Sequence, residues 1–168
     1  MSATFAIGEG FAGEGADAAH VNTMLGLRDG PVGVAWATAL ATPRAGHSAF
    51  VVVVAPNVPV KPMTLFVNKA TVEAGNDRHA RLTWGAAQAG VAAGVMHAHR
   101  KGVLRADDAD EVVLVAAVWV NPAADDEEAV FENNAQATLA ALTAGRDSLP
   151  ALPTVLDAGE PRNPYFRA

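Results

Sequence analysis

Residues 55–71 read APNVPVKPMTLFVNKAT, and this stretch decides how the predicted sheet is connected. It follows the most apolar run of the chain, AFVVVVAP at 49–56, whose β-branched content predicts a strand buried on both faces. Pro56, Pro59 and Pro62 fix φ and remove backbone donors, so a rigid loop is predicted after this strand. Because so short a loop cannot make a parallel crossover, the next strand, predicted over 64–73, should be an antiparallel neighbour in a mixed sheet.

Lys69 and Thr71 lie near the end of this second strand. In an extended chain they are two residues apart and therefore share one side. A stiff loop that presents a lysine and a threonine on one face is a common way to build a binding site. The alternative is a solvated lysine on an edge strand.

The rest of the chain predicts an α/β fold of the α+β type, a mixed sheet with packed helices. A strand at 4–9 precedes a glycine-rich turn, and a second strand covers 18–27. Helices are predicted over 32–41, over 77–101 and from 125 to Gly145, with a further buried strand at 112–120. Small residues in the second helix indicate close packing against a sheet or another subunit. The 168 residues form one predicted domain, and 146–168 form an irregular tail that is either disordered or wraps a neighbouring subunit.

Composition excludes several classes of protein. The net charge of -6 argues against a nucleic-acid binder, which needs a basic surface. The absence of cysteine excludes disulfides and thiolate metal sites, and the histidines lack a metal-binding spacing. Apolar runs are too short to cross a membrane and no export signal opens the chain, so we expect a cytoplasmic protein without a membrane partner.

His20 is the candidate for acid–base chemistry. It lies in the strand at 18–27 and shares a face with Asn22, two residues further on. An imidazole both gives and takes a proton near neutral pH, which suits a general acid or base. The alternative is a structural histidine whose ring nitrogens are satisfied by neighbouring groups.

Several segments resemble the formaldehyde-activating enzymes, and they occur in the same order as in that family. They are DAAHVN at 17–22, APNVPVKPMTLFVNKAT at 55–71, GAAQAG at 85–90, ADDADEVVLVAAVWVNPAADD at 106–126 and NNAQAT at 133–138. The resemblance covers roughly residues 8–145. Its most specific parts are the proline loop, the NK-T motif that contains Lys69 and Thr71, and the G-AQ-G motif that contains Gln88.

The resemblance implies a carbon–oxygen hydro-lyase of one-carbon metabolism, methylotrophy and formaldehyde detoxification. Members of the family condense formaldehyde with tetrahydromethanopterin, which is a cosubstrate, and no bound cofactor or metal is expected. Their fold resembles domain 2 of ribosomal protein S5. They form homopentamers with the pterin in a cleft between subunits, so the expected partners are formaldehyde, the reduced pterin and further copies of this chain.

The match also implies roles for single residues. His20 corresponds to the family's proposed catalytic histidine, and the pterin contacts would be Asn22, Val51, Lys69, Thr71 and Gln88. Gln88 could instead lie on a solvated helix face.

The sequence also departs from the family. Asn22 replaces the usual aspartate, Val51 replaces a leucine, and about two residues are inserted around 73–77. These departures leave two alternatives open. One is a non-catalytic paralogue that binds or senses formaldehyde or a pterin, and the other is a structural oligomer without a small-molecule site.

Overall fold

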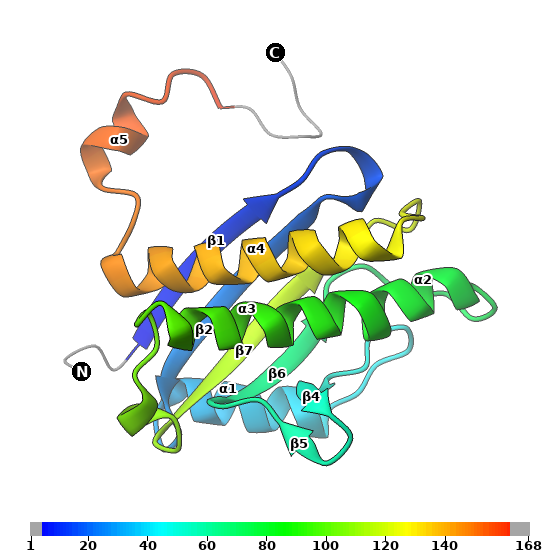
Figure 1. Ribbon diagram of the computed structural model, residues 1–168, viewed down its shortest axis with the longest axis horizontal. Coiled ribbons are helices and arrows are strands. Elements are labelled where there is room, and N and C mark those ends of the chain that lie inside the picture. Colours follow the sequence, from blue (N-terminus) through cyan, green and yellow to red (C-terminus); the bar gives the residue numbers. More distant parts are fainter. Residues whose placement is uncertain (1–4, 162–168) are drawn as a thin grey trace.

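A five-stranded mixed sheet forms the centre of the computed structural model, which describes residues 5–161 (Figure 1). The strand order is β1-β2-β7-β6-β3, and every neighbouring pair is antiparallel except β6 and β7, which are parallel. The strands are β1 (Phe5–Ala12), β2 (Ala19–Leu27), β3 (Phe50–Val51), β6 (Met63–Asn68) and β7 (Val112–Trp119). The predicted mixed sheet and the antiparallel pairing across the proline loop are confirmed.

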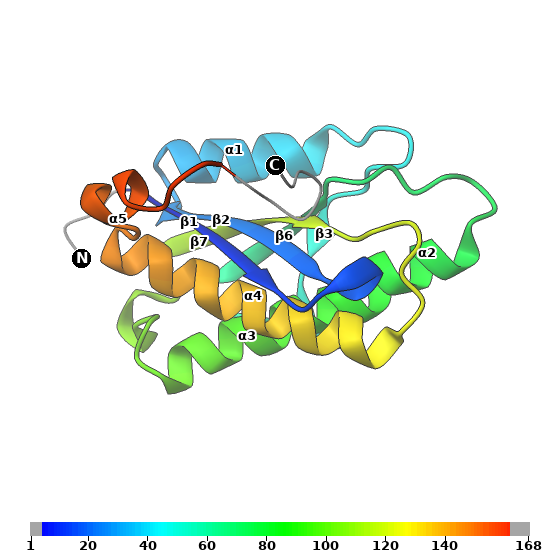
Figure 2. The same cartoon turned by 90° about the horizontal axis from the view of Figure 1, so that it is seen from above.

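Helices cover both faces of this sheet (Figure 2). α1 lies on one face, and α3 and α4 lie side by side on the other. The helical segments are η1 (Gly15–Asp17), α1 (Pro31–Ala41), α2 (Asp77–Arg81), the π-helical η2 (Leu82–Ala87), α3 (Gln88–Arg100), η3 (Ala106–Asp108), α4 (Glu127–Asp147) and α5 (Leu152–Leu156). Among residues 5–161, no helix has the length and apolar content needed to span a bilayer.

Two apolar layers result from this arrangement. The larger one fills the space between the sheet and helices α3 and α4, and includes Phe66, Leu114 and Val91. The smaller one joins Val32 of α1 to Val113 and Val115 of β7. Because successive side chains of a strand point to opposite faces, each central strand contributes to both layers.

The apolar run at 49–56 does not form the predicted strand buried on both faces. It is divided into β3 and a second short strand, β4 (Val53–Ala55), and β3 lies at the edge of the sheet. Val52 is buried, whereas Val54 is 48% exposed. β4 leaves the sheet to pair with β5 (Val58–Pro59), so the position of the run is set by this hairpin rather than by its hydrophobicity.

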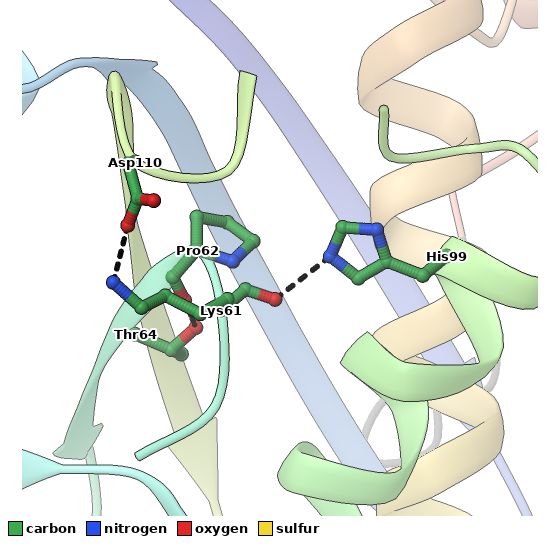
Figure 3. Close-up of polar contacts among 5 residues, drawn as sticks. All are labelled: Lys61, Pro62, Thr64, His99 and Asp110. Carbon is green, nitrogen blue, oxygen red and sulfur yellow. Dashed lines mark hydrogen bonds and ion pairs between the residues drawn. The ribbon is translucent and has the colours of Figure 1, made fainter. Parts of the chain in front are cut away.

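The proline loop is ordered, as predicted, by contacts from distant parts of the chain (Figure 3). His99 Nε2 donates to the carbonyl oxygen of Lys61 at 2.8 Å, and Thr64 Oγ1 donates to the carbonyl oxygen of Pro62 at 2.8 Å. The Lys61 ammonium pairs with the Asp110 carboxylate. These contacts hold the loop at the end of the sheet where β6 and β7 both begin.

β1 is longer than predicted because its glycines belong to the strand rather than to a turn. Gly8 and Gly10 face α4, and a Cβ atom on them would lie 1.8 Å from the carbonyl oxygen of Ala141 and 2.1 Å from that of Ala137. No other residue allows so close an approach. The turn begins only at Gly13, whose φ is +81°.

Two small residues of α3, Gly90 and Gly94, pack closely against α4. A Cβ atom on Gly94 would lie 2.6 Å from Cβ of Thr138, and one on Gly90 would lie 2.4 Å from the carbonyl oxygen of Phe131. The predicted helix at 77–101 corresponds to α2, η2 and α3 in succession, and the side chain of Asn76 caps its start. The inserted segment lies just before this cap, and its Gly75 has a φ of +86°.

α4 does not end at Gly145, as the sequence predicts. It continues to Asp147, and Ser148 takes the left-handed conformation that terminates it. Gly145 instead allows the helix to approach the backbone of Ile7 and Gly8. The predicted tail therefore starts inside α4 and contains α5, while residues 162–168 lie outside the described part of the chain.

Substituting glycine by alanine in α3 tests this packing. Gly94→Ala should lower the free energy of unfolding by about 1–3 kcal/mol, because the new methyl group overlaps α4. Gly85→Ala is the matched control, since no atom lies within 4 Å of its added Cβ. It should leave stability unchanged or raise it by up to ~1 kcal/mol. Chemical denaturation measures both, and equal effects would contradict the close packing of α3 on α4.

The Lys61–Asp110 pair gives a pH-dependent prediction. The hydrogen bond and charge of Lys61 hold the pKa of the Asp110 carboxyl below its ordinary value of 3.8. A carboxyl whose pKa is lower in the folded state stabilises the fold above its ordinary pKa and ceases to do so as the pH falls through its folded value. Asp110→Asn should therefore lower the melting temperature slightly at pH 7, and the difference should vanish in acid. A difference that grows below pH 4 would contradict this assignment.

Candidate functional site

β2 sorts its side chains onto two faces, as the sequence predicts. Ala19 and Val21 are fully buried beneath α3 and α4. His20 and Asn22 point to the face that carries α1, since Met24, two residues further along, packs with Val32 of that helix. His20 is half-buried and Asn22 is exposed.

Strand pairing brings His20 and Lys69 into one row across the sheet. Phe11 of β1 and Trp119 of β7 lie on either side of His20 in the register. The backbone N–H of Lys69 donates a hydrogen bond to the carbonyl oxygen of Val118 at 2.8 Å. This bond extends the β6–β7 ladder by one residue and places Lys69 beside Trp119. With strands about 4.8 Å apart, the Cα atoms of His20 and Lys69 are separated by about 10 Å.

A carboxylate from β1 contacts the histidine. Glu9 Oε1 lies 3.0 Å from His20 Nε2. Because a carboxylate accepts hydrogen bonds, Nε2 carries the proton of this contact and Nδ1 is left to face a ligand. In the strand register Glu9 is directly opposite Asn22, so both side chains belong to the same face as His20.

Lys69 and Thr71 follow the end of β6 and do not form a continued strand. β6 ends at Asn68, and the next four residues form a bend whose side chains contact the segment 44–47. His47 Nε2 lies 3.0 Å from Thr71 Oγ1. The proline loop is at the opposite end of β6, roughly 20 Å away for a six-residue strand, so it does not present these two residues directly.

Val51 and Gln88 lie elsewhere. Val51 is on β3, three strands from His20 in the sheet order. Gln88 is on α3, on the opposite face of the sheet, and its Oε1 accepts a hydrogen bond from the backbone N–H of Val53 at 2.7 Å. Gln88 is only 8% exposed, so the alternative of a solvated glutamine is wrong. Within one chain, the six predicted residues therefore form two separate groups.

A pocket of about 310 Å³ lies beside the first group, between the end of α1 and the end of β6. Its lining includes Arg44, His47, Asn68 and Lys69. Two cationic side chains and a histidine give this pocket a polar, positively charged wall. A larger pocket of about 510 Å³, near the start of β1 and the end of α4, contains none of the predicted site residues.

Two further histidines, His79 and His99, have structural partners. His79 is buried and its Nε2 lies 3.1 Å from the carbonyl oxygen of Val120, while His99 holds the proline loop. Within residues 5–161, no three His, Asp or Glu side chains are grouped as metal ligands would be.

Comparison with known proteins decides the family. The model of the formaldehyde-activating enzyme family matches residues 7–166. The chain belongs to the formaldehyde-activating enzyme family. The resemblance of the separate motifs is thereby confirmed and extends over nearly the whole sequence.

Curated relatives of this formaldehyde-activating enzyme family member match most of the chain. A protein of Methanosarcina barkeri named 5,6,7,8-tetrahydromethanopterin hydro-lyase is 36% identical over 160 residues, which cover 95% of this chain and 89% of the relative. Proteins named bifunctional enzyme Fae/Hps from Methanosarcina barkeri and Archaeoglobus fulgidus are 39% and 40% identical over 153 residues. These matches cover 91% and 90% of this chain, which spans only 38% of each bifunctional protein.

Three residues of the candidate site of this family member were missed by sequence reasoning, namely Glu9, His47 and Trp119. Glu9 was placed at the end of the predicted strand at 4–9 and given no role, although its alternation with Gly8 and Gly10 fits a longer strand with one face packed closely. Trp119 could have been found by pairing the predicted strand at 112–120 with the predicted strand at 18–27, because this pairing can place Trp119 opposite His20. His47 has no such signal, because its position depends on a loop.

Gln88 gives a test of the observed geometry. Gln88→Met should lower the free energy of unfolding by about 1–2 kcal/mol, because the N–H of Val53 loses its acceptor. Gln136→Met on the exposed face of α4 is the control and should change stability little. Thermal denaturation of both variants measures the difference. Equal losses would mean that the hydrogen bond contributes nothing.

Proposed function

We propose that the protein condenses formaldehyde with tetrahydromethanopterin to give 5,10-methylenetetrahydromethanopterin and water. Family membership supports this activity, as does the similarity to a tetrahydromethanopterin hydro-lyase over 89% of that relative's length. The observation that carries the proposal is the row of His20, Trp119 and Lys69, with Glu9 bonded to His20. This row offers a proton donor and a cation on one open face.

The reaction needs positioning and one well-placed proton. A secondary amine of the pterin attacks formaldehyde and gives a carbinolamine. Protonation of its hydroxyl group releases water and leaves an iminium ion, and the neighbouring arylamine then closes the ring with loss of a proton. Formaldehyde and the pterin thus become the methylene compound and water, with no change in oxidation state. Holding the pterin in one conformation and protonating the leaving hydroxyl are the steps that a protein accelerates.

His20 is the proposed proton donor, acting through Nδ1. The Glu9 carboxylate accepts from Nε2–H, which fixes the orientation of the ring and leaves Nδ1 outside this contact. Once Nδ1 has given its proton to the hydroxyl group, the ring remains hydrogen-bonded to Glu9 in a single tautomer. Glu9 is therefore a positioning residue for His20.

The position of Glu9 accounts for Asn22. Residues 9 and 22 are directly opposite in the antiparallel register, so an aspartate at 22 would place two carboxylates side by side. Like charges in such cross-strand pairs are destabilising. An amide avoids this repulsion and can still exchange hydrogen bonds with a pterin. The carboxylate that contacts the histidine comes from the neighbouring strand.

We further propose that the site is completed by a second copy of the chain. The predicted residues form two groups, which suits a cleft between subunits. The first group, on one face, is His20, Asn22, Lys69 and Thr71, and the second, near the β3 edge, is Val51 and Gln88. Apolar side chains are exposed on β1 and α1, including Phe5, Ile7 and Val34, as expected of a surface buried in an oligomer. The proposed assembly is the family's homopentamer, with the fold of ribosomal protein S5 domain 2 and a cytoplasmic location, and with no tightly bound cofactor.

The test is the rate of methylene-tetrahydromethanopterin formation from formaldehyde and the reduced pterin. The wild type should exceed the uncatalysed rate, and His20→Ala should lose about 10²- to 10⁴-fold in kcat, the usual contribution of a general acid. Glu9→Ala should lose part of the acceleration. Glu9→Gln should retain more of it, because an amide oxygen still accepts from Nε2–H.

His97→Ala is the control, because His97 is exposed on α3 and should be dispensable. If the wild type binds the pterin but does not accelerate the condensation, the protein is a binding paralogue and not an enzyme. A His20→Ala variant with undiminished kcat would remove His20 from its role, and sedimentation as a monomer would contradict the shared site.

A further inference from the structure

Two loops are joined beside the end of α1 by hydrogen bonds between residues far apart in the sequence. The carbonyl oxygen of Gly46 accepts from Asn68 Nδ2 at 2.8 Å and from the backbone N–H of Val72 at 3.0 Å. Gly46 has a φ of +72°, and a Cβ atom there would lie 2.5 Å from Thr71 Cγ2. The segment 44–47 therefore holds the bend that contains Lys69 and Thr71.

His47 contacts the side chain of Thr71, and the protons on its ring are assigned from its hydrogen-bond partners. Nδ1 lies 3.0 Å from the carbonyl oxygen of Asn68, which can only accept, so Nδ1 carries a proton. In the neutral ring Nε2 must then be an acceptor, and Nε2 lies 3.0 Å from Thr71 Oγ1. The hydroxyl proton of Thr71 is thus directed toward His47.

This arrangement determines what Thr71 can offer to a ligand. A hydroxyl group has one proton and two lone pairs. With the proton held by His47, the outward side of Oγ1 presents lone pairs alone and accepts hydrogen bonds without donating them. The same histidine lines the 310 Å³ pocket together with Lys69 and Arg44, so the three side chains share one wall.

We infer that His47 is a positioning residue for the pterin site, which fixes the Thr71 hydroxyl as an acceptor and so selects an N–H group of the ligand. The inference rests on the proposed function for the identity of that ligand. A reduced pterin carries N–H donors on its ring and on its amino group, and acceptors at its carbonyl oxygen and at one ring nitrogen. Thr71 would contact one of the N–H groups, and a binding orientation that brought an acceptor of the pterin to Thr71 would oppose two sets of lone pairs.

Tautomer measurement on the free protein is the first test, and it needs no pterin. The five histidines are labelled with ¹⁵N, and the resonances of His47 are assigned by their loss in His47→Gln. The expected result is a protonated Nδ1 and an unprotonated Nε2. A protonated Nε2 at neutral pH would overturn the inference, because Thr71 would then receive a proton from the ring.

Equilibrium binding of tetrahydromethanopterin is the second test. Thr71→Val, which keeps the shape but lacks the hydroxyl, should raise Kd about 3- to 10-fold, the effect of one hydrogen bond. His47→Phe should raise Kd by a similar factor, while the Kd of Thr71→Ser should stay near that of the wild type. The double variant Thr71→Val/His47→Phe should bind no more weakly than either single variant, because both remove the same hydrogen bond.

Several outcomes would overturn the role of His47. Losses that add in the double variant would mean that His47 acts through another contact, and an unchanged Kd in His47→Phe would mean that it does not act on binding. The kcat at saturating pterin should stay within about twofold of the wild type in these variants, since His20 is untouched. If the wild type binds the pterin without accelerating the condensation, the proposed enzymatic activity is contradicted but the role of His47 in pterin binding is not. A wild type that binds no pterin would overturn both.

Discussion

Helix α4 lies against β1 on one side and α3 on the other, so close that no side chain fits at Gly8, Gly10, Gly90 or Gly94. Carbonyl groups of the helix occupy the space that Cβ atoms of β1 would need. Protein interiors are packed densely enough that a single added methyl group must displace its neighbours. These contacts therefore determine where α4 lies along the sheet, and with it the position of α3.

The same packing determines the chemistry of the opposite face. Because Gly8 and Gly10 point to α4, Glu9 and Phe11 must point away from it, toward the face that carries His20. Shifting the pairing of β1 by one residue would direct the Glu9 side chain into the backbone of α4. The contact between Glu9 and His20 thus follows from the absence of side chains on the other face.

Local patterns in the sequence were sufficient for the mixed sheet, for the α2–α3 helix and for the shared face of His20 and Asn22. Each of these depends on periodicity or on turn residues within one segment. The run at 49–56 was placed wrongly, because hydrophobicity does not distinguish an edge strand from a central one when a hairpin such as β4–β5 covers it. Glu9 and His47 were missed because their partners are 11 and 21 to 24 residues away and meet only through pairing.

The order of the strands also has a consequence for how the chain folds. β7 is the last strand in the sequence, yet it lies in the middle of the sheet, between β2 and β6. The N-terminal hairpin with His20 and the β3–β6 unit with Lys69 have no shared edge until β7 enters between them. Such non-local pairing forms slowly, because the chain loses the conformational entropy of a long loop before the stabilising contacts form. During synthesis, the two halves of the candidate site therefore remain apart until β7 has been made.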